Sequence, residues 1–298
     1  MGKASSASNQ AGFYLLGEKG FTALSHFIQQ FGATSVAFVV VGRDQNVQDD
    51  YSQQVIQLCS EHTIEFFERS DLKEVTADIY FAIGWRWILP TDRLVVFHDS
   101  LLPKYRGFAP LVNMLINGES EIGVTALKAV EEYDKGNILN RLTLSVSYPL
   151  KISDAISAIS RLYCESLCMV FKELVEGSEL LGTPQNESDA SYSLWRDEED
   201  YRINWHLSAE RIVRMVDALG APYMGAQTKC GDTELIIDEA EVWPDVDVED
   251  REQHVGKIIF KDSNEPIVVC GTGLVKINQI RDKATNTKAD VKFRTRFK

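Results

Sequence analysis

The sequence predicts an α/β protein with an open, mostly parallel sheet, followed by a small β-rich domain. Residues 36–42, VAFVVVG, form a continuous apolar run of the kind that is buried on both faces of a parallel sheet. Similar runs alternate with helical patterns through the first half of the chain, as in folds built from β-α-β units. After residue 220 the chain changes to short strand-like runs, which predict a small OB-like barrel.

Each element of the first half is predicted from its own local pattern. A long amphipathic helix is expected at 153–177, with Ser153 as its N-cap and Gly177 as its stop. The other expected elements are strands at 12–17, 36–42, 64–68, 78–84, 93–99, 122–130 and 138–147, and helices at 21–32, 52–62 and 109–117.

The same patterns divide the chain into domains. We expect a flexible N-terminus at 1–11, a catalytic domain at 12–177, a linker at 178–193 and a C-terminal domain at 194–298. The linker is rich in Ser, Gly, Pro and Asn and lacks periodicity. The C-terminal domain should contain a helix between Ser208 and Gly220, then strands at 225–230, 234–243, 255–261, 266–270 and 273–280.

Composition narrows the function classes. The 298 residues carry a formal net charge of −13, so the overall field repels nucleic acid, and we expect no nucleic-acid partner. The number of cysteines is odd, at five, and no C-x-x-C occurs, which argues against a disulfide framework or a zinc knuckle and suits a reducing cytoplasm. We interpret Cys164 and Cys168, four residues apart on one helix face, as apolar core residues. No run is long enough to span a bilayer, and the first ten residues do not resemble a signal peptide.

One strand ends in a residue suited to catalysis. His98 closes the apolar run 94–97, and catalytic groups of open α/β sheets lie at the carboxyl ends of strands. A core histidine bonded to backbone is an equal alternative when His98 is taken alone. Asp134 lies in the turn EEYDKGN, where its ordinary role is turn formation. Spacing alone does not bring Asp134 to His98.

The motif HDSLLPKYRGFAP (98–110), with the G-V-T segment at 123–125 and the Asp-x-Gly at 134–136, resembles the 10-formyltetrahydrofolate-dependent formyltransferase family. This family includes methionyl-tRNA formyltransferase, glycinamide ribonucleotide transformylase and the sugar N-formyltransferases. Residues 202–226 are similar to the start of the C-terminal domain of methionyl-tRNA formyltransferase. The resemblance covers nearly the whole chain after residue 12 and implies a Rossmann-like formyltransferase fold.

The resemblance implies that His98 and Asp134 are the catalytic residues and face each other in a cleft. His98 would donate to the oxyanion or relay a proton, and Asp134 would hold a water and tune His98. The family also places Asn two residues before the His, where this chain has Val96. Another donor such as Asn113, Asn117 or a backbone N–H could replace it, transfer could be slow, or the chain could be a hydrolase or a binding protein.

Further site residues follow from the resemblance. Trp87, Ile88 and Leu89 are expected beside the pterin of the donor. Core packing is the alternative for the tryptophan pair Trp85 and Trp87. Val130 and Glu131 are expected in the same pocket, next to Asp134. Lys104 and Arg106 are candidate contacts to an anionic acceptor, with a solvated basic corner as the alternative.

The expected activity is therefore formyl transfer from 10-formyltetrahydrofolate, without a metal, to a nucleotide-linked amino-deoxy sugar used in surface polysaccharide such as lipopolysaccharide O-antigen. The acidic chain has no basic insertion after its second strand, which disfavours a tRNA acceptor. The alternatives are a 10-formyltetrahydrofolate hydrolase, a divergent methionyl-tRNA formyltransferase, and a weakly catalytic protein that binds folate or sugar nucleotide. Partners are expected to be small molecules, with a homodimer left open and no membrane association.

Overall fold

The structure is a computed structural model, and it describes residues 9–71, 74–90 and 92–298. Residues 1–8, most of the predicted flexible N-terminus, lie outside the described residues. The chain forms two compact units. Unit 1 comprises 1–110, 121–145 and 156–194, and unit 2 comprises 111–120, 146–155 and 195–298.

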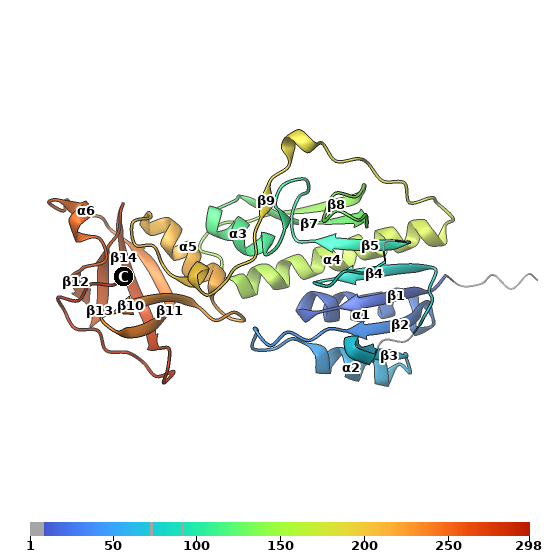
Figure 1. Cartoon of the computed structure of the whole chain (residues 1–298), viewed down its shortest axis with the longest axis horizontal. Coiled ribbons are helices and arrows are strands. Elements are labelled where there is room, and N and C mark those ends of the chain that lie inside the picture. The colour runs from blue at the N-terminus through green and yellow to red at the C-terminus, as the bar shows by residue number, and fades with distance from the viewer. Residues whose placement is uncertain (1–8, 72–73, 91) are drawn as a thin grey trace, which may run out of the picture. The chain divides into compact units, whose positions relative to one another are not determined.

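Unit 1 is built on a seven-stranded sheet with the order β3-β2-β1-β4-β5-β7-β8 (Figure 1). The strands from β3 to β5 are parallel, while β7 is antiparallel to both β5 and β8. The predicted α/β architecture with a mostly parallel sheet is confirmed. The strands are β1 (Ala11–Leu15), β2 (Val36–Val41), β3 (Phe66–Glu68), β4 (Ile79–Ile83), β5 (Leu94–His98), β7 (Glu121–Lys128) and β8 (Ile138–Ser145).

Two helices cover one face of this sheet because their apolar faces meet its alternate residues. Phe27 of α1 (Gly17–Phe31) packs against Phe13 of β1, with ring centroids 5.0 Å apart. Phe27 also meets Phe171 of α4 (Ile152–Val175), at 4.7 Å. Phe97 of β5 joins this layer through Tyr163 of α4, at 5.8 Å. The helix α2 (Ser52–Glu61) follows β2 and contacts α1.

The strand order reverses between β1 and β4. From β1 the chain builds outward to β2 and β3, and it then returns to place β4 and β5 on the other side of β1. Ligands of open α/β sheets bind outside the carboxyl ends of the strands at such a switch point. The residues that follow β1, β4 and β5 are therefore the first place to look for a site.

The long helix α4 differs from the prediction at one end. It begins at Ile152, so Ser153 lies inside its first turn and is not the N-cap that the pattern predicted. Gly177 does end it: Gly177 has a φ of 80°, and its N–H donates to the carbonyl of Leu174. Ser178 N–H donates to the carbonyl of Glu173, which completes a Schellman motif and satisfies the last carbonyls of the helix.

Unit 2 contains a five-stranded antiparallel sheet with the order β10-β11-β14-β13-β12, so the small β-rich domain is confirmed. The final residues bridge its two edges: Lys298 exchanges backbone hydrogen bonds with Lys229, and Ile258 donates to Thr295. Phe297 is buried and stacks on Trp205 at 5.5 Å. The strands are β10 (Ala226–Cys230), β11 (Thr233–Trp243), β12 (Ile258–Asp262), β13 (Glu265–Val269) and β14 (Leu274–Asp282).

The helices of unit 2 include α5 (Ala209–Leu219), whose Ser208 side chain accepts from Arg211 N–H as the predicted N-cap. The short α6 is Arg251–His254, and α3 is Pro110–Asn117. Residues 178–193, predicted as a linker, belong to unit 1 and contain β9 (Tyr192–Ser193), which pairs with β6 (Arg106–Gly107). The predicted domain boundaries themselves stay a prediction.

Candidate functional site

His98 is the last residue of β5, and each of its two ring nitrogens faces an oxygen atom. Its Nε2 lies 2.7 Å from the carbonyl oxygen of Tyr105. Since a carbonyl only accepts, Nε2 must carry the hydrogen. Nδ1 then faces Asp134, with 3.5 Å to Oδ1, and the two side chains are only 8% and 12% exposed. The structure thus brings together the two residues that sequence spacing could not, with Nδ1 as the atom free to take a proton.

Asp134 is held by its own backbone and by the loop after β5. Asp134 has a φ of 56°, in the left-handed region that Asp tolerates better than most residues. The N–H of Gly107 donates to its Oδ2 at 2.8 Å, which leaves Oδ1 toward His98. A Cβ at Gly136 would lie 1.7 Å from the carbonyl oxygen of Lys128. Only glycine therefore fits the third position of the Asp-x-Gly turn, and this explains the motif physically.

The loop that follows His98 is fixed by a dense set of hydrogen bonds. Ser100 Oγ donates to the carbonyl of Lys104 at 2.6 Å, and Thr125 Oγ1 donates to the carbonyl of Ser100 at 2.6 Å. Arg141 Nη1 donates to the carbonyl of Leu102 at 2.9 Å. The loop therefore holds the Tyr105 carbonyl, and with it the His98 ring, in one orientation.

Arg106 supports the turn that contains Asp134, through Gln185. Its guanidinium is fully buried and forms an ion pair with Glu187 at 2.8 Å. It also donates to Oε1 of Gln185 at 2.8 Å. Gln185 in turn donates to the carbonyls of Asp134 at 2.6 Å and Gly136 at 2.9 Å. Sequence reasoning missed Gln185, because it lies in a segment without periodicity.

Lys104 and Arg106, the two residues predicted to contact the acceptor, differ in burial. The Arg106 guanidinium is already occupied by Glu187 and Gln185 within the chain. The Lys104 side chain is exposed on the loop surface. A contact of either residue to an acceptor stays a prediction, and Lys104 is the one with a side chain open to solvent.

Of the predicted donor-binding residues, Leu89 packs on the sheet face that carries Tyr14 and Leu94. Leu89 and Ala129, the neighbour of Val130, pack against an apolar cluster that includes Tyr14 and Leu94. Ile88 is 83% exposed and Val130 47% exposed, and Glu131 is also exposed. Trp87 lies edge-on to Trp85, at 4.8 Å, and the Arg69 guanidinium covers it at 4.5 Å. Their role in binding a donor stays a prediction.

Trp85 is a candidate that sequence reasoning did not single out. It follows β4 at the switch point, and its ring contacts Tyr14 at 5.4 Å. Its indole nitrogen is buried and has no hydrogen-bond partner in the part of the chain that the structure describes. A buried donor without a partner costs free energy, so it marks a place where a ligand acceptor would fit. The only signal in the sequence was the position of Trp85 just after an apolar strand.

Val96 lies two residues before His98 on the same side of β5 and packs against the cluster that contains Leu94. The two asparagines considered as replacement donors belong to unit 2. There Asn113 Oδ1 accepts from Arg196, and Asn117 Oδ1 accepts from Arg211 at 3.1 Å. Both carboxamide oxygens therefore have arginine partners within unit 2.

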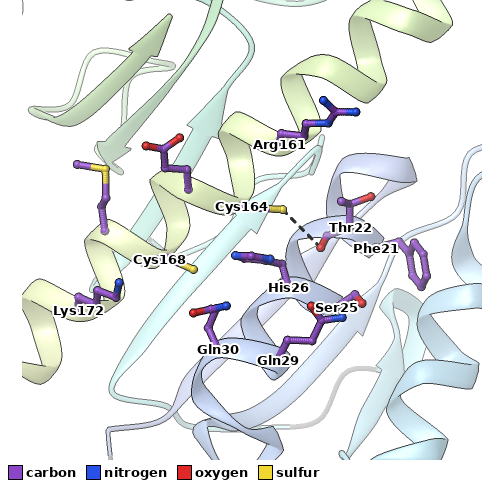
Figure 2. A pocket seen from close by; sticks show the side chains of 12 residues that line it. Phe21, Thr22, Ser25, His26, Gln29, Gln30, Arg161, Cys164, Cys168 and Lys172 are labelled. Atoms are coloured by element: carbon purple, nitrogen blue, oxygen red, sulfur yellow. Dashed lines mark hydrogen bonds between the residues drawn. The ribbon is translucent and has the colours of Figure 1, made fainter.

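A separate groove of about 700 Å³ lies between α1 and α4. Figure 2 shows Cys164 and Cys168 of α4 directed toward α1, which contributes His26 and Gln30. Burial, and secondarily the neighbouring Cys168, raises the pKa of Cys164 to about 11, so this thiol stays protonated at neutral pH. None of the predicted site residues lines this groove. The assignment of the site to His98 and Asp134 stays a prediction.

The described residues contain no cluster of three His, Cys, Asp or Glu side chains that could hold a metal ion. Nor is any described helix long and apolar enough to cross a membrane.

Comparisons with known proteins agree with the fold. Residues 39–159 match the formyl transferase family, and residues 196–293 match the formyl transferase C-terminal domain. A methionyl-tRNA formyltransferase from Marinobacter nauticus is 28% identical over 189 residues, which are 63% of this chain and 59% of that protein. The chain thus covers less than two thirds of this relative's length.

Solved structures show the same architecture. An N-formyltransferase from Helicobacter canadensis superposes with a TM-score of 0.65 at 15% identity, over 90% of this chain and 98% of the other. HypX from Aquifex aeolicus gives 0.61 at 17% identity, over 93% of this chain and 45% of the other. At these identities the likeness shows the fold alone.

Proposed function

Because the chain belongs to the formyl transferase family, we propose that it moves a formyl group from 10-formyltetrahydrofolate to the amine of a nucleotide-linked amino-deoxy sugar. The observation that carries the proposal is the pair His98–Asp134, 3.5 Å apart at the carboxyl end of β5. The pair lies one strand from the switch point where α/β sheets bind their ligands.

The geometry supports acid–base work on an amine. The donor supplies the electrophilic formyl carbon when it is bound. His98 accepts through Nδ1 the proton that the attacking amine loses, because Nε2 is committed to the Tyr105 carbonyl. Asp134 stabilises the imidazolium that results, and Gly107 N–H keeps the carboxylate in place. His98 then returns the proton to the departing nitrogen, so the amine becomes a formamide and no net proton is left on the protein.

The residues after β4 fit a flat, partly apolar donor. The ring of Trp85, whose indole N–H has no partner among the described residues, lies on the sheet face that also carries Val96 and Leu89. A Cβ at Gly42 would lie 3.0 Å from the Trp87 ring and 3.2 Å from Trp85. The aromatic pair would offer a pterin ring an apolar wall, and the indole N–H would offer its heteroatoms a donor.

The surface around Asp134 supports a ring-containing acceptor. Phe108 and Tyr133 are 46% and 64% exposed, although they are large and aromatic, and their ring centroids are 6.3 Å apart. Exposed aromatic pairs beside reactive groups commonly bind planar or sugar rings. The Helicobacter canadensis relative was solved with folinic acid and dTDP-3-aminofucose. The net charge of −13 supports a small acceptor over tRNA.

This proposal places the protein in the cytoplasm, where nucleotide-linked sugars for surface polysaccharide such as O-antigen are made. The test is a panel of dTDP- and UDP-linked amino sugars with 10-formyltetrahydrofolate, read as tetrahydrofolate release and formamide mass. Acceptor-dependent release with one or a few sugars supports it. Release of formate at the same rate with and without an amine would identify a hydrolase instead. A hydrolase is the second candidate because Val96 stands where the family has Asn. Formylation of charged initiator tRNA in preference to every sugar would overturn the acceptor class.

A further inference from the structure

Three polar side chains meet on the side of β5 that the helices cover, and one of them belongs to the residue after His98. Asp99 follows His98, and its carboxylate forms an ion pair with Lys19 of α1. Tyr163 of α4 donates its hydroxyl to the same carboxylate. The two side chains of the ion pair are mostly buried, at 18% and 14% exposure. Asp99 is the second residue of the motif at 98–110, but the proposed chemistry uses none of these three side chains, which we call the Asp99 cluster (Lys19, Asp99 and Tyr163).

The protonation states within the Asp99 cluster follow from burial and charge. Burial alone would raise the pKa of Asp99, but the Lys19 ammonium and the Tyr163 hydroxyl together lower it below its usual value. Burial, followed by the charge of Asp99, raises the pKa of Tyr163 well above its usual value. The cluster therefore holds a carboxylate, an ammonium and a neutral hydroxyl. Burying such a charge pair costs desolvation free energy, and it is weak evidence for a role in stability alone.

The Asp99 cluster contacts the chain on both sides of His98. Tyr163 Oη lies 3.3 Å from the carbonyl oxygen of Phe97, the residue before His98, and it also bonds Asp99, the residue after it. Asp99 and His98 interact electrostatically, since His98 is among the groups that lower the pKa of Asp99. The carboxylate would favour a charged imidazolium, and the adjacent ammonium offsets that effect.

We propose that Lys19, Asp99 and Tyr163 are positioning residues for His98, in which the ion pair keeps the imidazole neutral enough to accept a proton from the amine. The proposal rests on the proposed function for the identity of that amine. It goes beyond it in assigning a role to three residues that do not touch the reacting atoms. Its physical content is charge balance: either half of the ion pair, left alone, would shift the ionisation of His98, and in opposite directions.

Four other charged side chains lie on the elements around His98, and none of them is changed in the variants of Lys19 and Asp99. Asp134 faces the imidazole from the turn after β7. On the loop after β5, the Lys104 side chain is exposed, and the Arg106 guanidinium is paired with Glu187. Arg141 of β8 is bonded to the Leu102 carbonyl. Variants at Lys19 and Asp99 leave all four of these groups in place.

The experiment is an NMR titration of the His98 imidazole in the full chain, assigned with the His98→Gln variant. Lys19→Met leaves the carboxylate uncompensated, so the pKa of His98 should rise by about half a unit or more. Asp99→Asn leaves the ammonium uncompensated, so the pKa should fall by about as much. The acidic limb of the kcat/KM profile for formyl transfer should shift in the same directions, because His98 must be neutral to act.

Two controls separate charge balance from a structural effect. Lys19→Arg keeps the charge and should restore the parent His98 pKa, and Lys172→Met removes an exposed lysine of α4 and should leave it unchanged. Shifts in the same direction for Lys19→Met and Asp99→Asn, or no shift in either of them, would overturn the proposal. The titration needs no acceptor, so a failure to find a sugar substrate would count against the proposed function and leave this result readable.

Discussion

The backbone N–H of Gly107 donates to the Oδ2 of Asp134, so one residue of the loop after β5 fixes the carboxylate that faces His98. This bond joins two segments that are separated by α3 and β7 in the chain. Position 107 requires glycine, because its φ is 100° and a Cβ there would lie 2.5 Å from the carbonyl oxygen of Ser193. The loop and the Asp134 turn act as one rigid support.

The first prediction concerns the pair itself. His98→Ala and Asp134→Asn should each lower kcat for formyl transfer by about a hundredfold or more, because one removes the base and the other the charge that stabilises it. Circular dichroism and Tm should change little, since the carboxamide oxygen introduced by Asp134→Asn would still accept from the N–H of Gly107. Asp154→Asn, an exposed change on α4, is the matched control. Full activity in either site variant would refute the site assignment.

The second prediction concerns Val96. If the family's amide donor has been lost, Val96→Asn should raise turnover, by up to about a hundredfold. It should also lower Tm, because the new amide replaces a side chain that packs against an apolar cluster. Val96→Ala is the control, since it loses the same packing without gaining a donor. Turnover that stays flat or falls in Val96→Asn would mean that another group already holds the oxyanion.

The fold was largely predictable because its signals are local. The apolar runs of β1, β2, β4 and β5 and the caps Ser208 and Gly177 follow from strand and helix chemistry that acts over a few residues. The start of α4 was misplaced because a serine in the first turn of a helix has the same sequence pattern as an N-cap.

The site was predictable only in part because its contacts are long-range. His98 could be found from its strand end, but its approach to Asp134 depends on the antiparallel pairing of β5 with β7. Gln185, which holds the Asp134 turn, lies in a stretch without periodicity, and nothing in the sequence pairs it with Arg106. Lys19 and Asp99 are also far apart in the chain, so the sequence does not show the ion pair that they form in the structure.

A third prediction separates the two basic residues of the loop. Arg106→Leu should lower Tm and reduce kcat, because the buried guanidinium holds Gln185, and Gln185 holds the turn of Asp134. The expected loss of stability is about 2–4 kcal/mol, as for other buried and hydrogen-bonded charges. Lys104→Ala should leave Tm unchanged and raise only the KM of an anionic acceptor. Thermal unfolding and steady-state kinetics measure both, and an unchanged Tm in Arg106→Leu would contradict the structural role.

A fourth prediction concerns the exposed rings beside Asp134. Phe108→Ala and Tyr133→Ala should raise the KM of the nucleotide-linked acceptor several-fold, with a smaller effect on kcat, because the rings bind the acceptor without touching the reacting atoms. Leu181→Ala removes a similarly exposed apolar side chain in the same unit and serves as the control. Isothermal titration with dTDP and with UDP would show the loss directly. Unchanged affinity in the double variant would rule out this surface.

A fifth prediction concerns pH and stability in unit 2. Burial raises the pKa of Asp217 from 3.8 to about 6, and one carboxylate oxygen is buried without a partner among the described residues. The folded state therefore binds this proton more tightly, so the free energy of unfolding falls as the pH rises from 3.8 to about 6 and then levels off. Asp217→Asn should be more stable by about 3 kcal/mol at pH 8 and equal at low pH. Urea unfolding at both pH values, with exposed Asp232→Asn as the control, measures this difference.

The backbone bonds of residues 295–298 with both β10 and the start of β12 have a consequence for handling the protein. Proteolytic loss of these few residues would leave two strand edges unpaired, and it would uncover the ring of Trp205 on which Phe297 stacks. Unpaired edges are templates for pairing with other copies, so a nicked preparation should precipitate on storage while the intact protein does not.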